Sequence, residues 1–134
     1  MDRVFLDSNV LFSTAWRRDS KFRRLWKIKN IVLLTSSYVL TEVLRNLEKP
    51  RHINDLEKLV REMTMVEATQ APPPPGIKLP AKDMPILADA ISGGATHLLT
   101  GDIAHFGAWY GKTVAGVRVL PPAEYLRSRK ISLT

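Results

Sequence analysis

The stretch that decides the fold is KDMPILADAISGGATHLLTGD, which runs from Lys82 to Asp102. Its first half predicts a helix, because apolar side chains recur at helical spacing at positions 86, 87, 90 and 91. Gly93 and Gly94 then favour the left-handed backbone that lets the chain reverse. The apolar run 97–100 that follows is too short for a helix and is typical of a strand. A helix leading into a strand is one repeat of a parallel α/β sheet, in which ligands bind beyond the carboxyl ends of the strands.

Two acidic residues bracket this repeat, and each has a structural and a functional interpretation. Asp83 opens the helix, so it is either an N-cap or a functional carboxylate. Asp102 directly follows the strand and its Thr-Gly pair, where it either belongs to a turn or stands at the functional edge of the sheet. The decision between these interpretations depends on acidic residues elsewhere in the chain.

The length and composition of the chain limit the classes of protein to which it can belong. The chain has 134 residues, which predicts one domain over residues 1–134, and 45% of them are hydrophobic, which supports a globular core. It has no cysteine, which excludes disulfides, thiolate metal sites and a cysteine nucleophile. The net charge of +7 predicts a polyanionic partner. The beginning MDRVFLDSN carries no apolar signal segment and no run reaches membrane-spanning length, so we expect a cytoplasmic protein without a membrane partner.

The remaining elements extend the same α/β pattern. Strands are expected at 3–6, 31–34, 65–66 and 117–120, which with 97–100 makes five, and further helices are expected at 36–47, 53–63 and 123–129. The run Ala71-Pro72-Pro73-Pro74-Pro75-Gly76 predicts a stiff loop that joins two halves of one sheet. The segment GAWYGKT has only three residues between its glycines, one fewer than a phosphate loop requires, and we reject nucleotide binding.

Two further acids occupy positions comparable with those of Asp83 and Asp102. Asp7 ends the first predicted strand, although it could also cap the helix that follows. Glu42 borders the apolar stripe of the helix 36–47, where its carboxylate can face a cleft. The alternative for Glu42 is a surface ion pair with Arg45 or Lys49.

Residues 16–30, WRRDSKFRRLWKIKN, carry seven basic side chains against the single Asp19. We interpret Phe22 and Trp26 as core residues. The basic side chains are either a solvated face or phosphate contacts, and we favour phosphate contacts. The predicted nucleic-acid-binding residues are Arg17, Arg18, Arg23, Arg24 and Lys27.

The four acids, Asp7, Glu42, Asp83 and Asp102, lie in a chain with a net positive charge, and this combination indicates metal-assisted chemistry. Three of them follow strands or open helices, where a parallel sheet would bring them together. Oxygen ligands without cysteine or a histidine pair favour Mg²⁺ or Mn²⁺ over zinc. Carboxylates clustered in a basic protein suggest metal-assisted cleavage of a phosphodiester.

These residues resemble the PIN-domain family, the ribonuclease fold of many toxins of toxin–antitoxin pairs. The resemblance runs from FLDSNVL (Phe5 to Leu11) through TSSYVLTEVLRNL (Thr35 to Leu47) to the stretch ending at Asp102. It implies a three-layer α/β/α sandwich with a central, mainly parallel, five-stranded sheet. It also implies a metal-dependent endoribonuclease that cleaves single-stranded RNA, commonly a homodimer, with an antitoxin protein as partner where the member is a toxin. The alternative is a catalytically idle PIN fold that only binds RNA or protein.

The resemblance also implies a set of site residues. The catalytic, metal-binding residues would be Asp7, Glu42, Asp83 and Asp102, with Ser8, Asn9 and Thr100 in supporting polar positions. Asp89 is assigned to the rim of the site. His105 is interpreted as a surface group that could assist proton transfer.

Overall fold

The computed structural model describes residues 1–67 and 74–131. Its strands are β1 (Asp2–Leu6), β2 (Ile31–Ser36), β3 (Thr64–Val66), β4 (His97–Leu99), β5 (Thr113–Val114) and β6 (Val117–Leu120). Its α-helices are α1 (Ser8–Trp16), α2 (Ser37–Asn46), α3 (Pro50–Arg61), α4 (Met84–Ser92), α5 (Ile103–Phe106) and α6 (Pro122–Ser128). Two 3-10 helices, η1 (Lys21–Lys27) and η2 (Gly107–Trp109), complete the described elements.

The central sheet has the strand order β3-β2-β1-β4-β6-β5 and is mainly parallel, as the sequence predicts. It has six strands where five were expected, because β5 pairs antiparallel with β6 at the edge of the sheet. The two strands are joined at Ala115 and Gly116, whose φ angles are 49° and 85°. Two successive positive φ angles are typical of the tight turns that close hairpins.

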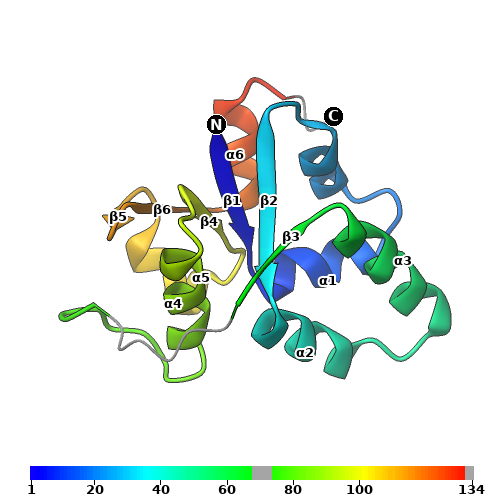
Figure 1. The fold of residues 1–134 in the computed structure, drawn as a ribbon, viewed down its shortest axis with the longest axis horizontal. Helices are drawn as coiled ribbons and strands as arrows, with labels where there is room; N and C mark the ends of the chain where they lie inside the picture. Colours follow the sequence, from blue (N-terminus) through cyan, green and yellow to red (C-terminus); the bar gives the residue numbers. More distant parts are fainter. Residues whose placement is uncertain (68–73, 132–134) are drawn as a thin grey trace.

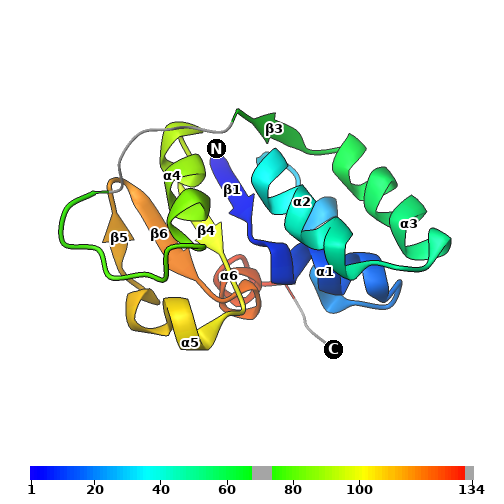
Figure 2. The ribbon, with the colours of Figure 1, turned by 90° about the horizontal axis from the view of Figure 1, so that it is seen from below.

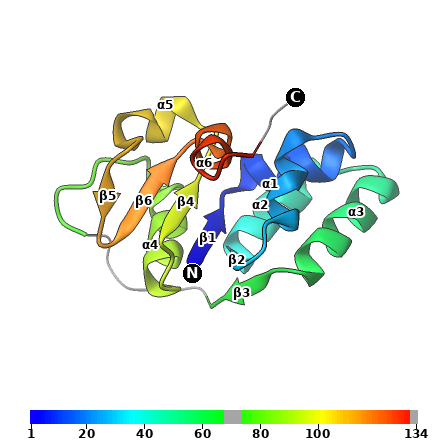
Figure 3. The ribbon, with the colours of Figure 1, turned by 90° about the horizontal axis from the view of Figure 1, so that it is seen from above.

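Helices cover both faces of the sheet, which gives the predicted three layers. The helix α4 contacts β2, β3, β4 and α2, whereas α6 contacts η1, which in turn contacts α1 (Figure 1). Seen edge-on from below and from above, α4 and α6 lie on opposite faces of the sheet (Figures 2 and 3). The middle strands are therefore covered twice, and side chains such as Phe5 and Leu98 are fully buried.

The two glycines that follow α4, Gly93 and Gly94, have different functions. Gly94 takes a positive φ of 68°, as the sequence predicts. Gly93 has an ordinary φ of −77°, but a Cβ added there would lie 2.6 Å from Cγ2 of Val66. Gly93 is therefore needed for close packing of α4 against β3, and Gly94 for the turn.

The basic segment departs from a regular α-helix. The helix α1 ends at Trp16, and η1 begins only at Lys21, capped by the Ser20 side chain. Leu25 is buried and Phe22 and Trp26 pack against the core, as expected.

The first half of the predicted proline loop, up to Pro73, lies outside the described residues. Within the described residues, no helix is long and apolar enough to cross a membrane.

Candidate functional site at the carboxyl edge of the sheet

Asp7 and the Thr100-Gly101-Asp102 segment follow two neighbouring central strands. β1 pairs with β4 in parallel register, with Leu6 opposite Leu99, and the Asp7 amide donates to the Leu99 carbonyl at 3.0 Å. From β1 the chain continues to β2 on one side, and from β4 it continues toward β6 on the other. Such a reversal of strand order opens a crevice at the carboxyl ends of the strands. The sequence pattern correctly predicts that Asp7 and Asp102 lie at this edge.

Asp7 is only 2% exposed and is held at both carboxylate oxygens. Its Oδ1 accepts a hydrogen bond from the Ser8 amide at 2.7 Å, which caps α1. Its Oδ2 accepts from Oγ1 of Thr100 at 2.8 Å and from Nδ2 of Asn9 at 3.2 Å. The helix-cap interpretation of Asp7 is therefore correct for one oxygen, while the other is oriented by the supporting residues that the resemblance implies.

Asn9 and Thr100 connect the two strand ends. The Asn9 Oδ1 accepts from the Gly101 amide at 2.7 Å, and its Nδ2 donates to Thr100 Oγ1 at 3.3 Å. Thr100 Oγ1 also accepts from the Asp102 amide at 3.1 Å. A Cβ at position 101 would lie 3.3 Å from Asn9 Oδ1, so Gly101 permits this close approach. Asp7 and Asp102 are thus linked through one small polar network.

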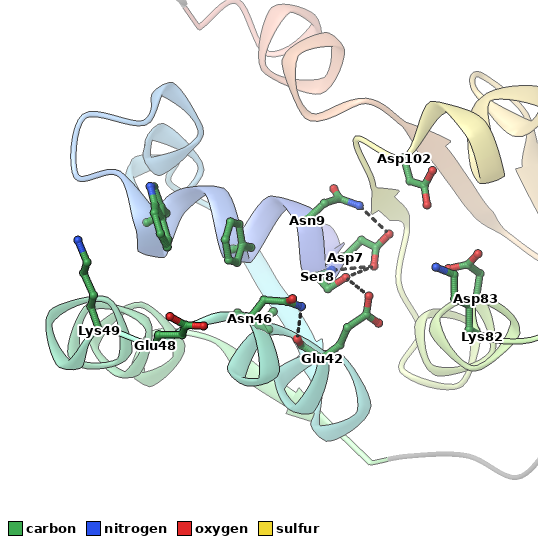
Figure 4. A pocket seen from close by; sticks show the side chains of 13 residues that line it. Asp7, Ser8, Asn9, Glu42, Asn46, Glu48, Lys49, Lys82, Asp83 and Asp102 are labelled. Carbon is green, nitrogen blue, oxygen red and sulfur yellow. Dashed lines mark hydrogen bonds between the residues drawn. The ribbon is translucent and has the colours of Figure 1, made fainter.

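Glu42 reaches the same site from α2. Its Oε1 accepts from Oγ of Ser8 at 3.1 Å, a hydroxyl that also lies 3.3 Å from Asp7 Oδ1. Figure 4 shows Glu42 turned toward Asp7 rather than along the outer face of α2. Its position fits the predicted cleft.

Asp83 begins α4, but its side chain makes no capping hydrogen bond. It is 5% exposed, and its Oδ2 is buried. Tyr38 of α2 donates its hydroxyl to the Lys82 carbonyl at 2.6 Å and so ties the start of α4 to α2. The capping interpretation of Asp83 is therefore wrong, and its carboxylate points into the site (Figure 4).

His105 belongs to the site, contrary to its interpretation as a surface group. Its Nδ1 lies 2.7 Å from Oδ2 of Asp83 and 2.9 Å from Oδ2 of Asp102. Both contacts lie within ion-pairing distance. The other oxygen of Asp102 caps α5 by accepting from the His105 amide at 3.2 Å. The signal for His105 was its spacing, because residues three apart share one face of a helix.

Burial disfavours the charged form of two carboxylates of the site, those of Asp7 and Asp83. Burial raises the pKa of Asp7, with Glu42 and Asp83 raising it further, against the lowering effect of the Thr100 and Ser8 hydrogen bonds. Burial also raises the pKa of Asp83, partly offset by the nearby imidazole of His105. A bound cation would offset this crowding of carboxylates.

All four predicted acids line one pocket of about 670 Å³. Within it, ligand atoms of Asp83, Asp102 and His105 all lie within 4.8 Å of one another. Carboxylate oxygens suit a divalent cation such as Mn²⁺ or Mg²⁺, whereas an imidazole nitrogen is a ligand that Mg²⁺ binds less readily. The Oδ2 of Asp83 and the Nδ1 of His105, which are buried 2.7 Å apart, are two ligand atoms that such an ion would bind. The residues present therefore fit a metal ion.

The remaining predicted residues lie further out or are buried. Asp89 lies in the middle of α4 and is only 1% exposed, so its assignment to the rim of the site is wrong. Arg18 makes a bidentate pair with Asp55 at 2.8 and 3.2 Å. Arg23 donates to the Thr14 carbonyl at 2.6 Å.

The five predicted nucleic-acid-binding side chains separate into two groups. Among the described residues, none of the five lines the pocket of the acids. Arg17 and Arg18 line a neighbouring pocket, while Arg23, Arg24 and Lys27 lie on η1. Contact of these residues with nucleic acid stays a prediction.

Comparisons with known proteins identify the fold. No family model and no curated protein matches the sequence. A chain in the crystal structure of VapBC2 from Rickettsia felis, bound to a DNA fragment from their promoter, is similar over 89% of this chain and 98% of its own, with a TM-score of 0.66 and 18% identity. VapC20 of Mycobacterium tuberculosis, a toxin that cleaves the sarcin-ricin loop, is similar over 75% of this chain and 92% of its own, with a TM-score of 0.51 and 16% identity. The chain therefore has the PIN-domain fold of VapC toxins, which is the fold that its sequence predicts.

Proposed function

We propose that this protein is a metal-dependent endoribonuclease that cleaves phosphodiester bonds of single-stranded RNA. The observation that carries the proposal is the convergence of the carboxylates of Asp7, Glu42, Asp83 and Asp102 on one pocket. Burial is the main cause that raises the pKa of Asp7 and of Asp83, and carboxylates with perturbed pKa values that gather in one pocket are typical of a functional site.

The ion would be Mg²⁺ or Mn²⁺, held by the four carboxylates, and we add His105 to this set. When bound, it would acidify a water molecule and shield the negative charge that develops on the phosphate. Thr100 and Asn9 hold the Asp7 carboxylate in place, and Ser8 links it to Glu42. Tyr38 holds the start of α4, and with it Asp83, against α2.

The same proposal includes the partners of the protein. The likeness to a chain of the VapBC2 complex supports an antitoxin protein as a partner, and the likeness to VapC20 supports RNA as the substrate. The basic side chains Arg17 and Arg18, beside the pocket, would contact RNA phosphates. A homodimer and a cytoplasmic location stay predictions.

The test is a cleavage assay on labelled single-stranded RNA with Mg²⁺, with Mn²⁺ and in EDTA. We expect cleavage with a metal ion, none in EDTA, and recovery when Mn²⁺ is added back. The variants Asp7→Asn and Asp102→Asn should lose most of the activity. Glu124→Gln is the matched control, because Glu124 is an exposed acid of α6 that lines neither this pocket nor the neighbouring one.

Two outcomes would contradict the proposal in different ways. Cleavage that persists in EDTA would exclude the metal mechanism. Retained RNA binding without cleavage under any metal ion would instead favour the idle PIN fold that only binds RNA.

A further inference from the structure

The pocket of the four acids continues well beyond them. Its far part lies between the end of α1 and the end of α2 and is lined by Phe12, Trp16, Val43, Asn46, Glu48 and Lys49. Figure 4 shows Lys49 and Glu48 at one end of the pocket, Asp83 and Asp102 at the other, and Asn46 between them. The two ends differ in chemistry, because one is a cluster of carboxylates and the other combines aromatic rings with amide and charged side chains.

Trp16 is the principal side chain of this far end. It is the last residue of α1 and is 41% exposed. Its indole is nevertheless held, since Phe12 stacks on it at 5.4 Å and an interplanar angle of 23°, and the buried His52 lies against it at 4.3 Å. A fixed aromatic ring with exposed surface is suited to stacking, because little side-chain entropy is lost on binding.

Basic side chains, together with the acidic Asp19, lie on the other side of Trp16. A neighbouring pocket of about 620 Å³ shares Trp16 and Lys49 with the first pocket and is also lined by Arg17, Arg18 and Arg51. A bound strand that ran from the acidic end across Trp16 would therefore reach four basic side chains, those of Arg17, Arg18, Lys49 and Arg51. This order of acids, aromatic ring and cations matches the alternation of phosphates and bases in a nucleic acid strand.

The far end also offers specific polar groups beside the ring. The Nδ2 of Asn46 is engaged, because it donates to the Glu42 carbonyl at 3.0 Å. The amide oxygen of Asn46 and the carboxylate of Glu48 can then act as acceptors toward the pocket. Acceptors select a base that carries hydrogen-bond donors on its edge, such as the amino groups of guanine, adenine or cytosine.

We infer that the Trp16 end of the pocket is a nucleobase subsite. One unpaired base of the RNA, next to the phosphate held at the acids, packs against the part of Trp16 that Phe12 and His52 leave exposed, with its edge toward Asn46 and Glu48. The strand then continues toward Lys49 and Arg51. This inference rests on the proposed function, because it places the scissile phosphate at the carboxylates. A paired base cannot enter, so the subsite requires single-stranded RNA.

The test uses a short labelled RNA and a set of copies in which one nucleotide at a time lacks its base. Affinity is measured by fluorescence anisotropy with Ca²⁺ present, and cleavage with Mn²⁺. At one position next to the scissile phosphate, loss of the base should weaken binding to the wild type about 10-fold, a typical contribution of one stacked base. Trp16→Ala should weaken binding to the intact RNA by a similar factor. Its affinity should fall no further when the RNA lacks the base at that position.

Control variants separate stacking from folding. Trp16→Phe keeps an aromatic face and should restore most of the affinity and the dependence on position. Trp109→Ala removes a half-buried tryptophan outside this pocket and should leave the position dependence unchanged. At the same position, uracil should bind more weakly than the amino-bearing bases, and Glu48→Ala should reduce that difference.

The failure of this inference can be distinguished from the failure of the proposed function. If RNA is cleaved but Trp16→Ala binds and cuts every RNA copy like the wild type, the subsite is excluded and the aromatic end becomes a candidate surface for a partner protein. A second outcome is that no RNA is cleaved, but removal of one base weakens binding to the wild type and not to Trp16→Ala. In that case the nuclease proposal fails and the base-binding site stands.

Discussion

The Nδ1 atom of His105 lies 2.7 Å from Oδ2 of Asp83, although the two side chains come from different helices. Asp102, which caps the helix of His105, brings a third ligand atom within 2.9 Å of the same nitrogen. The half of the site that is formed by α4 and α5 is therefore arranged around a mixed set of oxygen and nitrogen ligands. Asp7 and Glu42 form the other half and are bridged by Ser8.

His105→Gln should weaken metal binding, because it removes the only nitrogen ligand of the proposed set. We expect the affinity for Mn²⁺ to fall at least about 10-fold, because even the loss of a side chain that only supports a metal ligand typically lowers metal affinity by this factor. The loss should be larger for Co²⁺ than for Mg²⁺, which prefers oxygen ligands. Calorimetric titration measures both. His97→Gln, a half-buried histidine of β4, is the control, and an unchanged Co²⁺ affinity in His105→Gln would exclude His105 as a ligand.

Asp83→Asn should uncouple stability from metal binding. Without metal it should melt no lower than the wild type, because burial disfavours the charged carboxylate more than the nearby His105 favours it. With Mn²⁺ at ten times its dissociation constant, the wild type should gain about 1.4 kcal/mol that the variant largely lacks. Melting curves with and without Mn²⁺ measure the difference. A full metal-induced shift in Asp83→Asn would exclude Asp83 from the site.

Thr100→Val tests the support of Asp7. The substitution keeps the shape of the side chain but removes the hydroxyl that donates to Asp7 Oδ2. We expect metal affinity or cleavage to fall about 10-fold, as is typical for groups that orient a metal ligand. Thr113→Val, on the exposed face of β5, is the matched control. Equal metal affinity and cleavage rate in the two variants would show that Thr100 contributes only to folding.

The sequence predicts those features that depend on local pattern. The apolar runs of β1 and β4 end at Asp7 and at Thr100-Gly101-Asp102, and parallel pairing necessarily brings their carboxyl ends together. The position of Glu42 is predictable for a similar reason, since the buried stripe of α2 determines which helix edge borders the sheet. Local pattern therefore predicts the sheet and the position of the acids.

What the sequence does not predict depends on contacts between distant segments. Asp83 has the position of an N-cap, and only the packing of α4 against α2 shows that its carboxylate is not used as one. The contact of His105 with Asp83 depends on how α5 lies relative to α4. Similarly, Arg18 and Arg23 have the pattern of surface charges, and only the fold brings the buried Asp55 of α3 between them.

The salt dependence of RNA binding tests which basic side chains contact phosphates. For single strands, the removal of one phosphate-binding side chain should reduce the slope of log affinity against log salt by about 0.7. We expect this reduction for Arg17→Ala and for Arg51→Ala, which lie beside the pocket. The sequence predicts the same reduction for Lys27→Ala, although Lys27 lies on η1 and lines neither pocket. An unchanged slope in Lys27→Ala would limit the phosphate contacts to the side chains beside the pocket, and unchanged slopes in Arg17→Ala and Arg51→Ala would remove the proposed path.

Acid stability should depend on Asp55. The Arg18 hydrogen bonds hold the pKa of this carboxyl below its ordinary value of 3.8, and they outweigh the opposing effect of burial. Below 3.8, the unfolded chain therefore binds more protons than the folded chain, so this stabilisation is complete above 3.8 and is lost as the pH falls through the folded pKa. Asp55→Asn removes the titrating group.

The measurement is the free energy of unfolding of the wild type and of Asp55→Asn from neutral pH down to acid. We expect the variant to be less stable at neutral pH and the difference to shrink as the pH falls below 3.8. The control is Asp19→Asn, whose exposed pair with Arg17 is screened by solvent and should contribute little at any pH. A stability difference that stays constant across the acid range would show that Asp55 acts through packing, and that its charge does not contribute to the stability of the fold.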